Sequence, residues 1–129
     1  MEKERESYLP GKEEPLIAVV GPCAAGKSTL VRGLEERGYR AKQVAQEHSY
    51  VPRMWQIITK PDVLIYVDAG YESCTERKQL DWTRVEYERQ IERLAHARQY
   101  CHVYLDTEGI TAQDALERAL KALETLLSP

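Results

Sequence analysis

Cysteine is scarce in this chain of 129 residues, and the few cysteines give no sign of a covalent framework. Cys23, Cys74 and Cys101 are odd in number and show no Cys-x-x-Cys spacing. This pattern indicates neither a set of disulfides nor a thiolate metal site. We therefore expect three reduced thiols.

Long hydrophobic runs are also missing. The two longest, residues 16–20 and 63–67, have the length of a strand, whereas a membrane-spanning helix needs about 20 apolar residues. Residues 1–6 read MEKERE and lack the apolar stretch of a secretion signal. We expect a cytoplasmic protein without membrane contact, and the charge-rich residues 1–15 predict a mobile N-terminal leader.

The chain has no surplus of positive charge, since 18 lysines and arginines stand against 21 acids and give a net charge of -3. Residues 1–15 hold five of the acids and three of the bases, so residues 16–129 are nearly neutral. This balance excludes a general electrostatic footprint for nucleic acid. A nearly neutral domain of this kind can accommodate a small anionic ligand more easily than a nucleic acid.

From residue 16 onward, apolar runs alternate with amphipathic stretches, which is typical of a parallel sheet covered by helices. The pattern predicts one compact domain over 16–129, an α/β fold in which three layers, α/β/α, surround a mainly parallel sheet of about four strands. We expect strands at 16–20, 40–45, 63–68 and 102–106. Helices are expected at 27–37, 52–59 and 72–79, from a capping box at 83–86 to about 100, and from 111 to the C-terminal region.

A loop that matches G-x-x-x-x-G-K-[ST] follows the first predicted strand and precedes the first predicted helix, the context that this motif requires. Glycines let such a backbone wrap a phosphate closely, and the backbone amides point at the anion beside a helix N-terminus. We expect the whole loop to bind the phosphates of a nucleotide: Gly21, Pro22, Cys23, Ala24, Ala25, Gly26, Lys27, Ser28 and Thr29.

Individual side chains of this loop have distinct expected roles. Lys27 adds a positive charge for the β- and γ-phosphates, and we expect it to serve the ligand rather than the core. The Ser28 hydroxyl is placed to join a magnesium shell. Cys23 is interpreted as a small residue in a tight loop, with a redox switch as the alternative.

With this loop, the chain resembles the nucleoside and nucleotide kinase-like branch of the P-loop NTPases, which includes thymidylate, shikimate and gluconate kinases. The resemblance covers residues 16–127. It also rests on residues 61–68, similar to the strand before the lid, on residues 72–77, and on residues 93–107. It implies Mg²⁺ and ATP or GTP as cofactors, a lid arginine at Arg77, and a nucleotide contact at Thr107.

The chain departs from this branch in two places. Relatives usually have a further strand with an Asp-Arg motif before the one at 63–68, but only residues 46–62 are available here. A strand and much of the acceptor site are therefore expected to be missing. The lid is also short, because residues 78–82 are all that separate the two predicted helices.

Two acids are candidates for the magnesium site or for the base that takes a proton from an attacking hydroxyl. Asp68 follows a buried strand and fits the Walker B form, but the family position that it resembles does not usually hold the metal. Glu47 follows the second strand and neighbours the loop if that strand takes the place of the missing one. We favour Glu47, with a solvated acid at a strand end as the alternative for each.

Several arginines could neutralise charge on a transferred phosphoryl group. Arg93 is favoured, since its like-charge neighbour Arg89 destabilises the helix unless an anion is present. Arg84 and Arg89 are interpreted as parts of a solvated, ion-paired face. Arg53 is the candidate for binding the acceptor of the phosphoryl group.

The sequence thus predicts a Mg²⁺-dependent phosphotransferase that uses a nucleoside triphosphate to phosphorylate a small molecule or a nucleotide. The alternative is a P-loop NTPase that hydrolyses nucleotide, or a nucleotide-dependent binding module, without a small acceptor. The shortened acceptor region favours this alternative.

Overall fold

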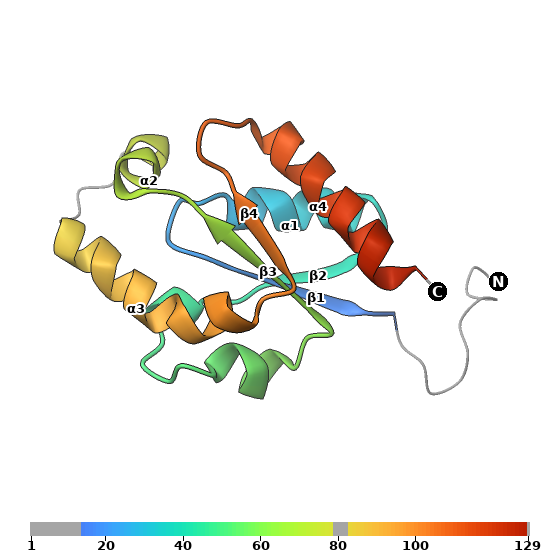
Figure 1. Ribbon diagram of the computed structural model, residues 1–129, viewed down its shortest axis with the longest axis horizontal. Helices are drawn as coiled ribbons and strands as arrows, with labels where there is room; N and C mark the ends of the chain where they lie inside the picture. Colours follow the sequence, from blue (N-terminus) through green and yellow to red (C-terminus); the bar gives the residue numbers. More distant parts are fainter. Residues whose placement is uncertain (1–13, 79–82, 129) are drawn as a thin grey trace.

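A computed structural model describes residues 14–78 and 83–128 of the chain. Within this part the expected α/β fold is confirmed: a parallel sheet has helices on both faces (Figure 1). The strand order is β2-β1-β3-β4. The strands are β1 (Leu16–Val20), β2 (Arg40–Gln43), β3 (Val63–Asp68) and β4 (Val103–Asp106).

The central strands β1 and β3 are buried on both faces, which explains their continuous apolar sequences. Alternate residues of each strand belong to two separate cores. One core joins Ile17 and Ile65 to α1 (Lys27–Glu36) and α4 (Ala112–Leu127). The other joins Tyr66 to Trp55 and to Leu94 of α3 (Arg84–Tyr100). The sheet therefore separates α1 and α4 from α3, which gives three layers.

The helix ends follow local sequence signals. The predicted capping box is present at α3, where the Thr83 hydroxyl accepts from the Glu86 amide and the Glu86 carboxylate accepts from the Thr83 amide. Thr111 caps α4 through the Asp114 amide. Helix α2 (Tyr71–Lys78) lies within one residue of its predicted range.

The segment between β2 and β3 differs most from prediction. Strand β2 ends at Gln43, and a short 3-10 turn that was not predicted, η2 (Gln46–His48), follows. The helix expected at 52–59 is a single π-helical turn, η3 (Trp55–Thr59). Most of the predicted leader, residues 1–13, lies outside the described residues. No described helix is long and apolar enough to cross a membrane.

Candidate functional site

The loop between β1 and α1 adopts a conformation that depends on its glycines. A Cβ atom on Gly21 would lie 2.2 Å from the Val67 carbonyl oxygen, so the loop passes β3 too closely for any side chain. Gly26 is left-handed, with φ of 106°, and serves as the N-cap of α1. No side chain of the described residues makes a capping hydrogen bond there. The N-terminus of α1 therefore remains available to an anion.

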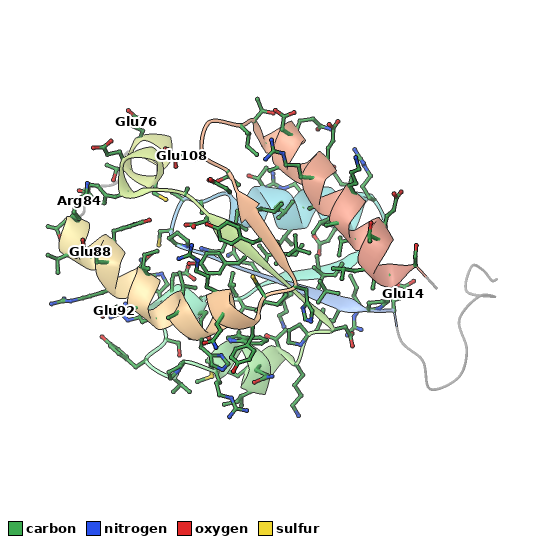
Figure 2. The ribbon with its side chains drawn as sticks, in the orientation of Figure 1. Glu14, Glu76, Arg84, Glu88, Glu92 and Glu108 are labelled. Carbon is green, nitrogen blue, oxygen red and sulfur yellow. The ribbon has the colours of Figure 1, made fainter. Side chains whose placement is uncertain are left out.

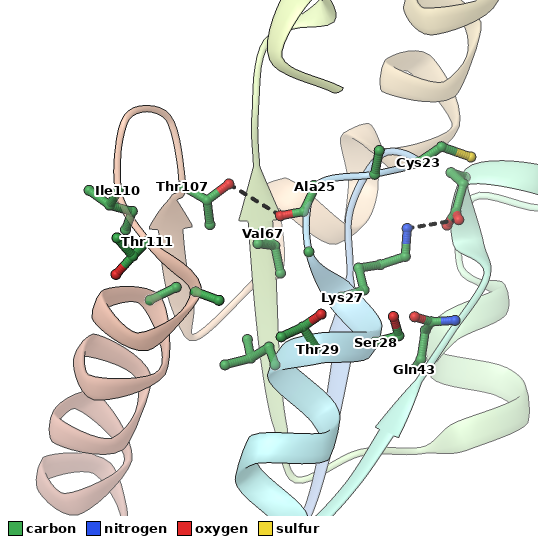
Figure 3. A pocket seen from close by; sticks show the side chains of 16 residues that line it. Cys23, Ala25, Lys27, Ser28, Thr29, Gln43, Val67, Thr107, Ile110 and Thr111 are labelled. Atoms are coloured by element: carbon green, nitrogen blue, oxygen red, sulfur yellow. Dashed lines mark hydrogen bonds and ion pairs between the residues drawn. The ribbon is translucent and has the colours of Figure 1, made fainter. Parts of the chain in front are cut away.

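A cavity of about 540 Å³ opens over this loop (Figure 3). Loop residues 23–29 line it, together with Gln43 and Glu47 on the β2 side. The opposite wall is formed by Val67, Thr107, Ile110 and the start of α4. Gly21 and Pro22 do not line the cavity but lie behind it, buried. The size is within the range of small-molecule sites.

Lys27 and Glu47 form a buried ion pair at the edge of this cavity. The Lys27 Nζ atom lies 2.9 Å from Glu47 Oε2, and each side chain is only 6% exposed (Figure 3). Lys27 also donates to the carbonyl oxygens of Gly21 and Pro22, at 2.7 and 3.0 Å. Its three N–H groups are thus matched by three acceptors. By contrast, the buried Glu47 Oε1 has no hydrogen-bond partner among the described residues.

The strand order brings Glu47 to the loop. Because β2 pairs directly with β1, the turn η2 that follows β2 lies at the same edge of the sheet as the loop between β1 and α1. The fully buried Gln46 fixes this turn: its amide nitrogen donates to the carbonyls of Val51 and Arg93, and its oxygen accepts from the Trp55 amide. Sequence reasoning missed Gln46, since a glutamine in a short loop carries no periodic signal.

Gln90 of α3 forms two hydrogen bonds with Cys23. The Cys23 amide donates to Gln90 Oε1 at 2.9 Å, and Gln90 Nε2 donates to Cys23 Sγ at 3.1 Å. His48 Nε2 lies 3.7 Å from the same sulfur. Gln90 was also missed, because its position on α3 reads as one polar residue among many.

Thr107 lies on the far wall of the cavity. Its hydroxyl oxygen lies 3.2 Å from the Ala25 carbonyl oxygen and 3.0 Å from the Asp68 carbonyl oxygen, so it links the residue after β4 to the loop after β1 and to the end of β3 (Figure 3). Ser28 and Thr29 are exposed to the cavity. The structure thus brings together Lys27, Ser28, Thr29, Glu47 and Thr107.

Asp68 is not brought to this group and does not line the cavity. It alternates with Val67 along β3 and therefore lies on the α3 side of the sheet, where the Tyr104 hydroxyl donates to it and Arg98 is 3.9 Å away. Burial and then Asp68 raise the pKa of Tyr104. The expected metal role for Asp68 is therefore not supported, and Glu47 is the acid beside the loop.

Where the structure describes their side chains, the expected arginines do not line the cavity either. Arg93 donates to the backbone carbonyl of Glu47 at 3.2 Å and lies over the Tyr50 ring, so it supports the turn η2 rather than facing the loop. Arg53 is exposed and donates to Gln56. Arg84 lies 4.7 Å from the Tyr71 ring on the outer side of the molecule (Figure 2). Arg77 is in α2, but its side chain is outside the described part.

Comparisons with known proteins show the fold and nothing more specific. No family model matches the sequence, and no curated protein matches it. The fold is similar to that of an uncharacterized protein from Eubacterium ventriosum ATCC 27560, with a TM-score of 0.53 and 9% identity. That similarity covers 87% of this chain and 99% of the other.

Proposed function

We propose that this chain is a Mg²⁺-dependent phosphotransferase that binds ATP or GTP in the cavity over its phosphate loop and belongs to the P-loop kinase-like proteins. One observation carries the proposal: a loop with the full G-x-x-x-x-G-K-S sequence places a buried lysine, paired with a buried glutamate, at the edge of a cavity. The cytoplasmic location expected from the sequence belongs to the same proposal.

The loop would bind the phosphates through the uncapped N-terminus of α1 and through Lys27. In the free protein, Lys27 already faces Glu47, so binding requires its ammonium group to exchange some of its protein acceptors for phosphate oxygens. The wall formed by Thr107 and Ile110 would contact the nucleoside. A preformed cavity keeps the conformational cost of binding small.

The residues present fit a magnesium ion. Glu47 offers a buried carboxylate oxygen without a partner among the described residues, and Ser28 offers a hydroxyl in the same cavity. These two side chains would hold the ion, directly or through water. When bound, Mg²⁺ would neutralise charge on the phosphates. Glu47 is also the group within the cavity that can accept a proton from an acceptor hydroxyl.

The binding step is tested by titrating the protein with a fluorescent ATP analogue and a GTP analogue, with and without Mg²⁺. Lys27→Met should weaken binding by about 10- to 150-fold, which corresponds to a charge-assisted hydrogen bond of about 1.5–3 kcal/mol. Lys42→Met is the matched control, since Lys42 is an exposed lysine on β2 that does not line the cavity. Equal affinity in the three proteins would contradict the proposal.

A second candidate function is nucleotide hydrolysis, or nucleotide-dependent interaction, without a small acceptor. It is favoured by one observation: among the described residues, Lys27 is the only basic residue that lines the cavity. A phosphorylated acceptor would lack a second cationic partner there. The two functions are separated by measuring ADP or GDP release with and without panels of nucleosides, nucleotides and hydroxylated metabolites. An acceptor-dependent rise favours the phosphotransferase, and a constant rate favours the second candidate.

A further inference from the structure

Three potential metal ligands of different chemistry meet at the rim of the phosphate loop. The Cys23 sulfur, the His48 Nε2 atom and a Glu47 carboxylate oxygen all lie within 4.8 Å of one another. They come from two segments, the loop after β1 and the turn η2. We propose that these residues bind a divalent transition-metal ion of the zinc type, and that this ion opposes the binding of Mg²⁺-nucleotide.

The spacing of the three groups agrees with this type of ion. A tetrahedral Zn²⁺, with Zn–S of about 2.3 Å and Zn–N or Zn–O of about 2.0 Å, holds its ligand atoms roughly 3.3–3.6 Å apart. The observed separations are 3.7 Å from Cys23 Sγ to His48 Nε2 and 3.8 Å from His48 Nε2 to Glu47 Oε2. Rotation of the largely exposed His48 side chain shortens these two separations, whereas the Cys23 sulfur and the Glu47 carboxylate, within 4.8 Å of each other, must approach by a shift of their own side chains.

The surrounding residues hold the segments that carry the three ligands in place before any ion binds. Gln90, which is 6% exposed, fixes the Cys23 backbone and directs an N–H group at its sulfur. Arg93 and Gln46 fix the turn that carries Glu47 and His48. Such supporting contacts orient metal ligands and raise affinity. The buried Glu47 Oε1, which lacks a hydrogen-bond partner among the described residues, leaves this carboxylate one oxygen for an ion while Oε2 is paired with Lys27.

The donor set selects the class of ion. A thiolate and an imidazole favour Zn²⁺ and similar transition metals, whereas Mg²⁺ and Ca²⁺ favour sites built from oxygen ligands alone. The thiolate and the carboxylate bring two negative charges, which compensate the repulsion between the metal ion and the nearby Lys27 ammonium group. Three protein ligands leave a fourth position open to water. The cysteine spacing predicted no thiolate metal site, because it detects paired cysteines and not one cysteine beside residues of another segment.

The antagonism follows from the shared carboxylate and rests on the proposed function. If Glu47 binds the ion at Cys23 and His48, its carboxylate is less available to a magnesium ion on the nucleotide. An ion bound to Cys23 also constrains the loop that has to surround the phosphates of the nucleotide. By linkage, each ligand should weaken the binding of the other by the same factor.

The site itself is tested on the full chain without nucleotide and under reducing conditions. Zn²⁺ affinity is measured by competition with a chromogenic chelator, and Co²⁺ is used to detect the ligand-to-metal charge-transfer absorption of a thiolate. Cys23→Ser and His48→Gln should each weaken Zn²⁺ binding by at least about tenfold, since even the loss of a supporting contact costs 10–100-fold. Cys101→Ser is the matched control, because Cys101 is a half-buried thiol whose Sγ donates to the Arg98 carbonyl.

The absence of thiolate absorption with Co²⁺, or equal Zn²⁺ affinity in His48→Gln and the unchanged protein, would overturn the site. His48 is 59% exposed, so this variant should fold even if Cys23→Ser does not. The antagonism is tested by adding Mg²⁺-nucleotide to the Co²⁺ complex and following the loss of absorption. Equal loss from Lys27→Met would mean chelation by the nucleotide and overturn the antagonism. If Zn²⁺ binds as expected but no nucleotide binds, the proposed function fails and the metal site does not.

Discussion

The ion pair between Lys27 and Glu47 should contribute to the stability of the free protein, in addition to its part in the proposed nucleotide site. Lys27→Met removes an ammonium group that donates to three buried acceptors. Glu47 would keep a carboxylate with 6% exposure whose Oε2 has lost its partner and whose Oε1 has none among the described residues. The sequence-based expectation that Lys27 serves the ligand rather than the core does not account for these three contacts.

The size of this effect follows from the burial of both groups. Removing one partner of a buried ion pair typically costs about 3–5 kcal/mol, because the other charge is left without compensation. The cavity beside Glu47 admits water, so we expect the lower end, about 3 kcal/mol. With a urea dependence of about 2 kcal/mol per molar, typical of a small domain, the unfolding midpoint should fall by roughly 1.5 M.

Urea unfolding followed by circular dichroism measures this change, and two further variants separate its causes. Lys27→Met combined with Glu47→Leu should recover most of the lost stability, since replacing a whole buried pair by apolar residues is often neutral. Lys42→Met, on the exposed side of β2, should change the free energy of unfolding by less than about 0.5 kcal/mol. Equal midpoints for Lys27→Met and the unchanged protein would refute the reasoning.

Three further predictions concern the two candidate acids and two residues of α3, Arg93 and Tyr87. Glu47→Gln should reduce Mg²⁺-dependent nucleotide turnover more than Asp68→Asn, because only Glu47 lines the cavity; the opposite order in steady-state assays would contradict this assignment. Arg93→Ala should destabilise the free protein by about 1–2 kcal/mol in urea unfolding, since it loses a hydrogen bond to the Glu47 carbonyl and a contact with Tyr50; no change would mean that the turn η2 needs no support from α3. Burial, followed by the charge of Asp68, raises the pKa of Tyr87 from 10.0 to about 12, so the folded state keeps a proton that the unfolded chain loses. The free energy of unfolding should therefore fall between about pH 10 and 12, less steeply in Tyr87→Phe, and identical slopes would exclude Tyr87 as a cause.

The parts of the fold that follow from local signals could be read from the sequence. Strands β1 and β3 match their predicted ranges, because a strand buried on both faces must be apolar throughout. The capping box at Thr83 and Glu86 fixes the start of α3, since its hydrogen bonds need only those two residues and their backbone. The loop motif likewise places Lys27 and Ser28 at the start of α1.

The supports of the site could not be predicted, because they join segments far apart in the chain. Gln90 contacts Cys23 across 67 positions, and Gln46 contacts the Arg93 carbonyl across 47. Neither glutamine lies in a motif, and each gains its role only when α3 packs on its face of the sheet. The π-helical turn at Trp55 was also beyond local reasoning, since helical periodicity does not distinguish it from an α-helix over five residues.

The choice between Glu47 and Asp68 shows where sequence reasoning needs the topology. Asp68 ends β3 and Glu47 follows β2, and the C-terminal ends of both strands lie at the loop edge of the sheet, so position alone does not separate the two acids. Strand alternation sets Asp68 on the face of Tyr66 and Tyr104, away from α1. Strand alternation does not determine the direction of the Glu47 side chain, because β2 ends at Gln43 and the turn η2 redirects the chain toward Lys27. The acid beside the loop is thus determined by the turn, and the turn is held by α3, so substitutions on α3 that never touch a ligand should still alter the site.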